Sequence, residues 1–246
     1  MNKTKIIIIL IVLSYIFNLL LCETQAEPPS NFNDSNAGSA NNPYLISNLA
    51  NLRWLKESPS VWSRHFLQTA DIDSLETIIW NNGVGIGEIG FDHEIVMPSP
   101  FRGTYDGDNY SIFNLYKNRQ GDPFWAARLS LFGFAAGANF KNIRLLDINF
   151  NGSDHWVLGG LVYEANFCKI TNVSISGNIS LTNKTHSAGG IGGSLLGIVR
   201  NTTVENCASY VNIVGNNLRN NLGGLIWILH DTIIKNSYFH GNIKPC

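Results

Sequence analysis

Alternating apolar and polar residues recur through the second half of the chain and predict short β-strands. Residues 143–150 read Ile-Arg-Leu-Leu-Asp-Ile-Asn-Phe, and residues 170–176 read Ile-Thr-Asn-Val-Ser-Ile-Ser. Val, Ile, Thr and Phe dominate these runs with a period of two, which is the spacing of side chains on one face of a strand. No stretch after residue 60 carries the 3.6-residue apolar period of a helix. This part of the chain is therefore expected to be all-β.

One short pattern, an apolar residue, any residue and then asparagine, recurs five times. Successive copies are 28, 30, 34 and 30 residues apart. Gly-Gly steps precede several copies, and a Gly-Asn-Ile step follows two of them, with Val211 in place of the glycine in the fourth copy. Three linked elements in register indicate an internal repeat. The repeated asparagines are Asn114, Asn142, Asn172, Asn206 and Asn236, and the glycines assigned a structural role are Gly160, Gly177, Gly190, Gly224 and Gly241.

The repeat length decides between architectures. A unit of about 30 residues cannot bury its apolar face alone, whereas stacked units can. We therefore predict a right-handed parallel β-helix (solenoid) of about five coils, with strands about 4.8 Å apart. The spacing is too short for a propeller blade, and a β-sandwich would not repeat a corner asparagine in register. The asparagines should form a ladder at one corner, because Asn tolerates left-handed backbone geometry and its amide can bond to the next coil.

Residues 43–100 are expected to form an N-terminal cap and the first strands, ahead of the repeats at 101–246. Leu45, Ile46, Leu49, Leu52 and Leu55 fall at helical spacing, with Ser47 as the predicted N-cap. A helix laid over the first coil would cover open strand edges that otherwise invite aggregation. The alternative is a helix packed on the outer wall. At the other end, the last coil has no comparable cover, which leaves self-association through it open.

The first residues resemble an export signal. Lys3 and Lys5 precede a long apolar run, and small residues lead up to Ala26, so residues 1–26 are predicted to be a signal peptide cleaved after Ala26. A lipoprotein box ending at Cys22, which would then carry a lipid anchor, is a second possibility, and an uncleaved membrane span is a third. Residues 27–42 are rich in Pro, Ser and Asn and are expected to be a flexible spacer. The protein is therefore expected to be secreted or held at the cell surface.

The charge balance excludes nucleic acid as a partner, and the cysteine positions limit the possible metal sites and disulfides. The chain has 17 basic and 18 acidic residues, a net charge of −1 and 31 asparagines. Nucleic-acid binding needs a basic surplus, so we expect no nucleic-acid partner. Cys22, Cys168, Cys207 and Cys246 have no metal-binding spacing. Either one disulfide or none among the last three is compatible with the sequence.

The repeat resembles a known family. The stretch from Gly160 through Asn172 to Ile179 is similar to the GLUG repeat of bacterial secreted and surface proteins. Residues 101–115 resemble the segment that opens such arrays, and residues 44–55 and 66–73 resemble the family's lead-in. The resemblance covers about residues 44–243. It implies a β-helix of the kind found in adhesin-like proteins and in the N-terminal regions of IgA-cleaving peptidases, but nothing here matches a peptidase module.

Candidate chemistry is sparse. No metalloprotease motif, nucleophile elbow or phosphate-binding loop is present, so we expect neither a metal nor a cofactor. Many β-helix proteins are carbohydrate-active enzymes that use paired carboxylates, which makes two acid pairs the weak catalytic candidates. Calcium binding at the second pair is a further alternative, although Asp-Gly is foremost a turn signal. The pairs are Asp71 with Asp73, and Asp106 with Asp108.

Two functions follow from the sequence. The first is an exported, non-enzymatic, adhesin-like binding or display module whose partner is a glycan or a host or cell-surface protein. The second is a polysaccharide lyase or glycoside hydrolase on the same scaffold. Convergence of three or more of the four aspartates, Arg144 and Glu164 in one groove would favour the enzyme, whereas their scattering would favour the binding module.

Overall fold

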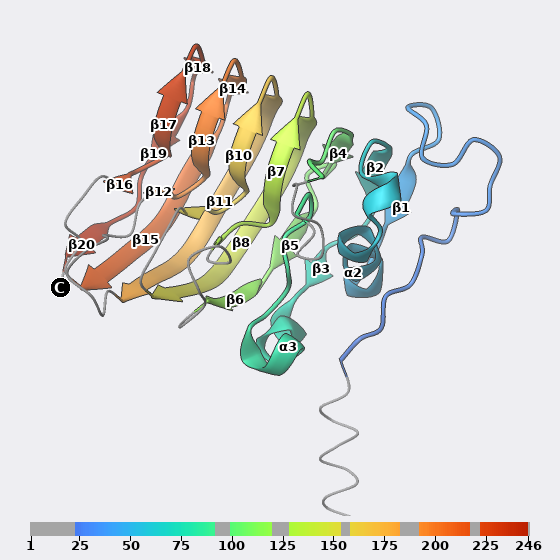
Figure 1. Ribbon diagram of the computed structural model, residues 1–246, viewed down its shortest axis with the longest axis horizontal. Coiled ribbons are helices and arrows are strands. Elements are labelled where there is room, and N and C mark those ends of the chain that lie inside the picture. Colours follow the sequence, from blue (N-terminus) through green and yellow to red (C-terminus); the bar gives the residue numbers. More distant parts are fainter. Residues whose placement is uncertain are drawn as a thin grey trace, which may run out of the picture.

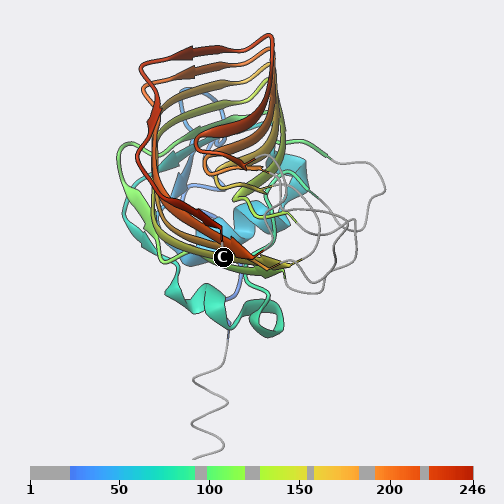
Figure 2. The same cartoon turned by 90° about the vertical axis from the view of Figure 1, so that its left-hand side faces the viewer.

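The chain folds into stacked parallel coils (Figure 1). The computed structural model describes residues 23–91, 99–119, 128–153, 158–182, 192–216 and 222–245. Every pair of named strands is parallel, which confirms the predicted all-β parallel solenoid. Figure 2 looks along the stack with the C-terminal coil nearest the viewer and shows the strands of successive coils lying over one another.

Three sheets run along the stack. The path of the longest is β1 (Tyr44–Ile46), β2 (His65–Gln68), β4 (Thr104–Asp106), β8 (Asn139–Ser153), β11 (Lys169–Thr182), β14 (Thr203–Glu205) and β18 (Ile233–Lys235). Branching from it are β3 (Ile72–Asp73), β5 (Ser111–Phe113), β6 (Tyr116–Arg119), β15 (Ala208–Asn216), β19 (Tyr238–Phe239) and β20 (Ile243–Pro245). The second sheet contains β7 (Phe132–Ala136), β10 (Val162–Asn166), β13 (Leu196–Arg200) and β17 (Ile226–His230), and the third β9 (Leu158–Gly159), β12 (Gly192–Gly193) and β16 (Leu222–Gly223).

The number of complete coils is smaller than predicted. Among the described residues, three coils carry a strand in all three sheets, compared with the expected five. The upstream strands β1 to β6 extend the long sheet, and single parallel bridges from Ile89 and Phe101 to β7 continue the second sheet at this end. Short helical segments occupy this end: α2 (Leu49–Glu57), η1 (Pro59–Val61), η2 (Leu75–Ile78) and α3 (Trp80–Gly83).

Asparagines in the left-handed backbone region stack at one corner of the coil. Asn142, Asn172, Asn206 and Asn236 have φ values of 55°, 55°, 54° and 47°. The Asn172 amide donates to the Asn142 side-chain oxygen at 3.1 Å, and the Asn206 amide donates to that of Asn172 at 3.2 Å. These bonds join the corners of neighbouring coils.

Asn114 stands outside this column. Strand pairing aligns Ser111 with Arg144 and Phe113 with Leu146, so Asn114 lies beside Asp147, one corner further along the coil. Its amide donates to Asp73 Oδ1 at 3.0 Å, whereas the Asn142 amide donates to Asp106 Oδ1 at 2.9 Å. The predicted column of five asparagines therefore contains four and excludes Asn114. The turn around Gly107 lengthens that coil and moves Asn114 to the next corner.

Further left-handed corners stand five residues before and after the asparagine column. The earlier column is Gly137, Phe167, Asn201 and Asp231, and the later one contains Asp147 and Gly177, all with positive φ. Gly177 has a φ of 127°, and a Cβ there would lie 2.3 Å from backbone atoms of Ile148. Val211 and then Gly241 follow it in the next two coils.

In one coil, the residues that align with the Gly-Gly steps of the neighbouring coils are not the predicted ones. Strand pairing places Gly159, Gly193 and Gly223 at equivalent positions. The position occupied by Gly160 and Gly224 in the flanking coils is therefore Ser194 in the middle coil, and Gly190 lies outside the described residues. Close packing selects glycine at position 160, because a Cβ would lie 2.4 Å from both Ile175 Cδ1 and Ser194 O.

A continuous apolar core fills the coils. It contains an aromatic stack that starts at the N-terminal end, where Tyr44 packs on Phe66 at 5.6 Å between ring centroids and Phe66 on Phe101 at 5.8 Å. Phe101 then stacks on Phe140 at 5.5 Å. These rings are nearly or completely buried, and aromatic burial of this extent dominates the apolar contribution to folding.

The N-terminal segment is more ordered than the sequence suggests. Helix α2 begins after Asn48, whose side chain accepts from Asn51 N, and not after Ser47, because Tyr44–Ile46 pair with β2 as a strand. The predicted flexible spacer at 27–42 packs on the body. Asn31 is 6% exposed and bonds to Pro43 O and Leu45 N. The helices of the described part are all too short or too polar to span a membrane.

The last coil leaves apolar side chains in solvent. The large hydrophobic residues exposed there are Leu229, Ile233, Ile234, Tyr238 and Ile243. In the preceding coil, the residues paired with Ile234 and Ile243 are Val204 and Ile213, which are fully buried. The exposure of Ile234 and Ile243 therefore reflects their position in the stack and not a change in the residue pattern.

Substitution of Asn172 tests the corner geometry. Asn172→Ala should lower the free energy of unfolding by about 1–3 kcal/mol, because alanine strains the left-handed backbone and two side-chain hydrogen bonds are lost. Asn172→Gly should cost less, since glycine accepts positive φ. Urea unfolding measures both. Equal losses for the two variants would contradict the backbone argument.

Phe167 is the bulky exception in its column. It has a φ of 54° and is 70% exposed, so little packing compensates for the strained backbone. Phe167→Asn should raise the free energy of unfolding by about 1 kcal/mol, and Asn201→Phe at the equivalent position should lower it. Loss of stability in Phe167→Asn, measured by urea unfolding, would show that the ring makes a compensating contact.

Candidate functional site: a lateral asparagine groove

The four candidate catalytic aspartates lie at turns and strand ends near the N-terminal coils. Asp71 Oδ1 accepts from Ser111 N at 2.7 Å, and Asp73 Oδ1 accepts from Leu75 N and from the Asn114 amide. Asp106 forms an ion pair with Lys141 at 2.8 Å and also accepts from the backbone N–H of Asp108. Asp108 itself has a φ of 45° within the turn. Asp71, Asp73 and Asp106 therefore hold the turns and strands together.

The remaining charged candidates lie elsewhere. Glu164 is on β10 of the second sheet, where it pairs with Arg200 at 2.6 Å. Arg144 lies exposed on β8 of the long sheet. Strand topology thus separates Glu164 from the aspartates.

Metal-binding and cysteine chemistry have little support in the described part of the chain. No group of three or more His, Cys, Asp or Glu residues there could hold a metal ion. Cys168 and Cys207 are buried free thiols. Burial raises the pKa of Cys168 and raises that of Cys207 to about 11, so both stay protonated at neutral pH. Cys22 and Cys246 lie outside the described residues.

A buried ion cluster joins the loop between α3 and β4 to β6. Lys117 Nζ lies 3.0 Å from Glu88 Oε1, and both side chains are fully buried. Arg119 Nη2 lies 3.3 Å from Glu88 Oε2. Burial lowers the pKa of Lys117 to about 8, although the Glu88 carboxylate opposes the shift. Because the Lys117 and Glu88 side chains are fully buried, this ion pair joins the loop to β6 inside the body of the protein.

Two neighbouring cavities form a groove along the later corner of the coils, at Asp147 and Gly177, which we call the asparagine groove. Two shallow cavities of about 310 and 250 Å³ share Asn178 as a common wall. The first is lined by Leu75, Ile78, Asn114, Tyr116, Asp147, Ile148, Asn149 and Asn178. The second is lined by Asn178, Asn212, Ile213, Val214, Asn242 and Lys244.

Strand register builds the groove. Asn149, Asn178 and Asn212 are consecutive Cα partners, and the Asn242 amide donates to Asn212 Oδ1 at 3.0 Å. One side-chain amide therefore recurs in each of four successive coils, spaced by about 4.8 Å. Each amide can donate and accept hydrogen bonds.

The groove is close to neutral and has apolar flanks. Asp147 lies in its first cavity and Lys244 in its second. Leu75 is 59% exposed and Ile78 is 47% exposed at the rim of the first cavity. Such a surface can bond hydroxyl groups through its amides and pack apolar ring faces against its rim.

An aromatic cluster lies on the strands just before the groove. The Tyr210 and Tyr238 rings are 5.9 Å apart, edge to face, and their hydroxyls bond to each other. The centroid of the His240 ring lies 6.3 Å from that of the Tyr210 ring. Both tyrosines are exposed, so they add ring surface to the C-terminal part of this wall.

The sequence predicts a structural role for the glycines of the Gly-Asn-Ile steps and none for their asparagines. Asn178 and Asn242 each follow the glycine of such a step, and Asn212 follows Val211. The recurring Asn was the available signal for the groove. Asn149 follows an isoleucine in a bulged coil, so only strand pairing identifies it as a member.

Comparison with known proteins gives partial matches. The chain is 29% identical over 143 residues to Halomucin from Haloquadratum walsbyi and 29% identical over 174 residues to an immunoglobulin A1 protease from Streptococcus sanguinis. Each match covers 58% of this chain, but only 2% and 9% of those relatives. A scan against known protein families finds no match.

A solved IgA1 protease structure supports the fold. It superposes with a TM-score of 0.50 and 19% identity, covering 81% of this chain and 16% of the other. At that identity the match concerns architecture alone. The chain is thus a parallel β-solenoid similar to a small part of much longer proteins.

The ion pair at Asp106 predicts a pH dependence. Partial burial alone would raise the pKa of Asp106, but hydrogen bonds from Lys141, Asn142 and Asp108 N outweigh it and hold the pKa below 3.8. The stability gained from the ionised carboxylate should be present above that value and disappear as the pH falls through the lowered pKa. Asp106→Asn should therefore be less stable than the wild type near neutral pH and similar to it in strong acid.

Unfolding at a series of pH values measures the Asp106 effect. In a Lys141→Gln background the difference should shrink, because one of the groups that lowers the pKa is gone. A difference between wild type and Asp106→Asn that is independent of pH would contradict the assignment.

Proposed function

We propose that this protein is an exported, non-enzymatic, adhesin-like β-solenoid that binds an extended, neutral, hydroxyl-rich ligand, namely a glycan, along the asparagine groove. The observation that carries the proposal is the column of four groove asparagines in successive coils, with Asn178 shared by both cavities. A ligand with repeated hydroxyl groups can form a hydrogen bond with each successive amide of this column. The near balance of charge disfavours a strongly ionic ligand.

Export and surface display draw on three kinds of support. The N-terminal sequence resembles a signal peptide, with lipidation at Cys22 as the alternative. The repeat resembles the GLUG repeat of bacterial surface proteins. The partial similarity to Halomucin and to an IgA1 protease is in keeping with a module of a surface or secreted protein.

The enzymatic alternative is weaker. A hydrolase or lyase on this scaffold needs acid and base groups facing one substrate. Asp71, Asp73 and Asp106 are engaged in structural bonds, and the lowered pKa of Asp106 does not suit a general acid. The asparagine groove contains one carboxylate, Asp147.

An oligosaccharide array with the exported protein tests the proposal. Neutral oligosaccharides should bind in preference to acidic ones, and Asn178→Ala should weaken binding of the best neutral oligosaccharide about tenfold, because Asn178 lines both cavities of the groove. Asn139→Ala is the matched control. Asn139 opens β8, before the corner at Asn142, and does not line either cavity of the groove, so this variant should bind as the wild type does.

Three results would count against the proposal. They are no neutral oligosaccharide bound, equal binding by the Asn178→Ala and wild-type proteins, or release of new reducing ends from a polysaccharide. The last would favour the enzymatic alternative.

A further inference from the structure

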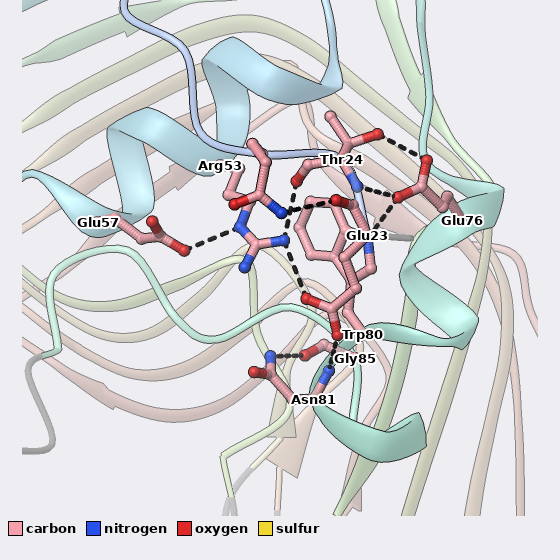
Figure 3. A network of polar contacts seen from close by, with 9 residues as sticks. Glu23, Thr24, Arg53, Glu57, Glu76, Trp80, Asn81 and Gly85 are labelled. Carbon is pink, nitrogen blue, oxygen red and sulfur yellow. Dashed lines mark hydrogen bonds and ion pairs between the residues drawn. The ribbon is translucent and has the colours of Figure 1, made fainter. Parts of the chain in front are cut away.

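The residues just before the predicted Ala26 cleavage site are bound to the folded body (Figure 3). Glu23 Oε2 lies 2.9 Å from Arg53 Nη1 on α2. Glu23 Oε1 accepts from Asn81 N at 2.7 Å, on α3. A single carboxylate therefore connects two elements of the N-terminal cap.

Thr24 adds a second set of contacts. Its carbonyl oxygen accepts from Arg53 Nη1 at 2.8 Å. Its hydroxyl donates to Glu76 Oε2 at 2.6 Å, and its backbone N–H donates to Glu76 Oε1. Glu76 lies on η2, so Thr24 also joins α2 to the following helical segment.

The partners form one connected network. Trp80 Nε1 donates to Glu76 Oε1 at 2.9 Å, and the Arg53 guanidinium stacks over the Trp80 ring at 4.7 Å. The Arg53 and Glu23 side chains are only 17% and 26% exposed. Charged groups so placed lose much of their hydration, and removing their partners is unfavourable.

The sequence offers two cleavage positions, and they affect this network differently. A cut after Ala26 removes Glu23 and Thr24 and with them five hydrogen bonds to Arg53, Glu76 and Asn81. A cut before Cys22 keeps all five. The Glu27 N–H, which donates to Ala50 O at 3.1 Å, survives either cut.

We infer that the mature protein retains Glu23 and Thr24, so that export processing does not cut after Ala26. The two residues then act as a clamp that holds α2 against η2 and α3 over the first coils. Of the two cleavage positions, the one before Cys22 satisfies this requirement. The inference is independent of the proposed ligand binding.

The N-terminal fragment of the exported protein tests the inference directly. A protease that cuts before aspartate releases a fragment ending at Asn33, whose mass gives the first residue of the mature chain. We expect this fragment to contain Glu23 and Thr24, whether or not Cys22 is present or modified. A fragment beginning at Glu27 would overturn the inference.

Thermal unfolding tests the physical reason separately. A chain beginning at Glu27 should melt about 4 °C or more below one beginning at Glu23, given the size of this domain. In the longer chain, the double variant Glu23→Gln, Thr24→Val should lower the melting temperature by a similar amount. Gln25→Ala should have little effect, because the Gln25 side chain is exposed and donates to Glu23 O rather than to the folded body. Equal melting temperatures for the two starting points would contradict the role of the clamp.

Discussion

The structure depends on every coil turning at the same place. Parallel strands bond to the coils before and after them, and a one-residue slip would move each apolar side chain from the core to solvent. The chain turns at residues with left-handed backbone geometry, which recur at five-residue intervals, for example at Phe167, Asn172 and Gly177 within one coil. The Asn172 amide adds side-chain bonds along the corner. Corner geometry therefore fixes both the register and the shape of the coil.

The same register builds the outer surface. Because equivalent positions lie one above the other, a residue type that recurs in the sequence becomes a column on the wall. Asn178 and Asn212 lie beside each other although they are 34 residues apart. A repetitive binding surface thus needs no elements beyond those that form the coil, and its polarity follows from the choice of amides at those positions.

The two ends of the stack differ in how they are held. At the N-terminal end, aromatic stacking of Tyr44 on Phe66 lies beneath α2, and the network around Arg53 ties the helical segments together. At the other end, core-type residues such as Ile234 are exposed. Neighbouring coils supply most of the burial in a solenoid, so the terminal coil has the least.

The sequence by itself determined the fold class and the strand pattern, because period-two alternation and a 30-residue repeat are local properties of the chain. Only the tertiary structure decided the register: it separated Asn114 from the asparagine ladder, and it placed Ser194 where glycine was expected. Turn insertions shift pairing without changing the local pattern. The groove around Asn178 and the packing of residues 27–42 depend on contacts between distant residues, which no local pattern encodes.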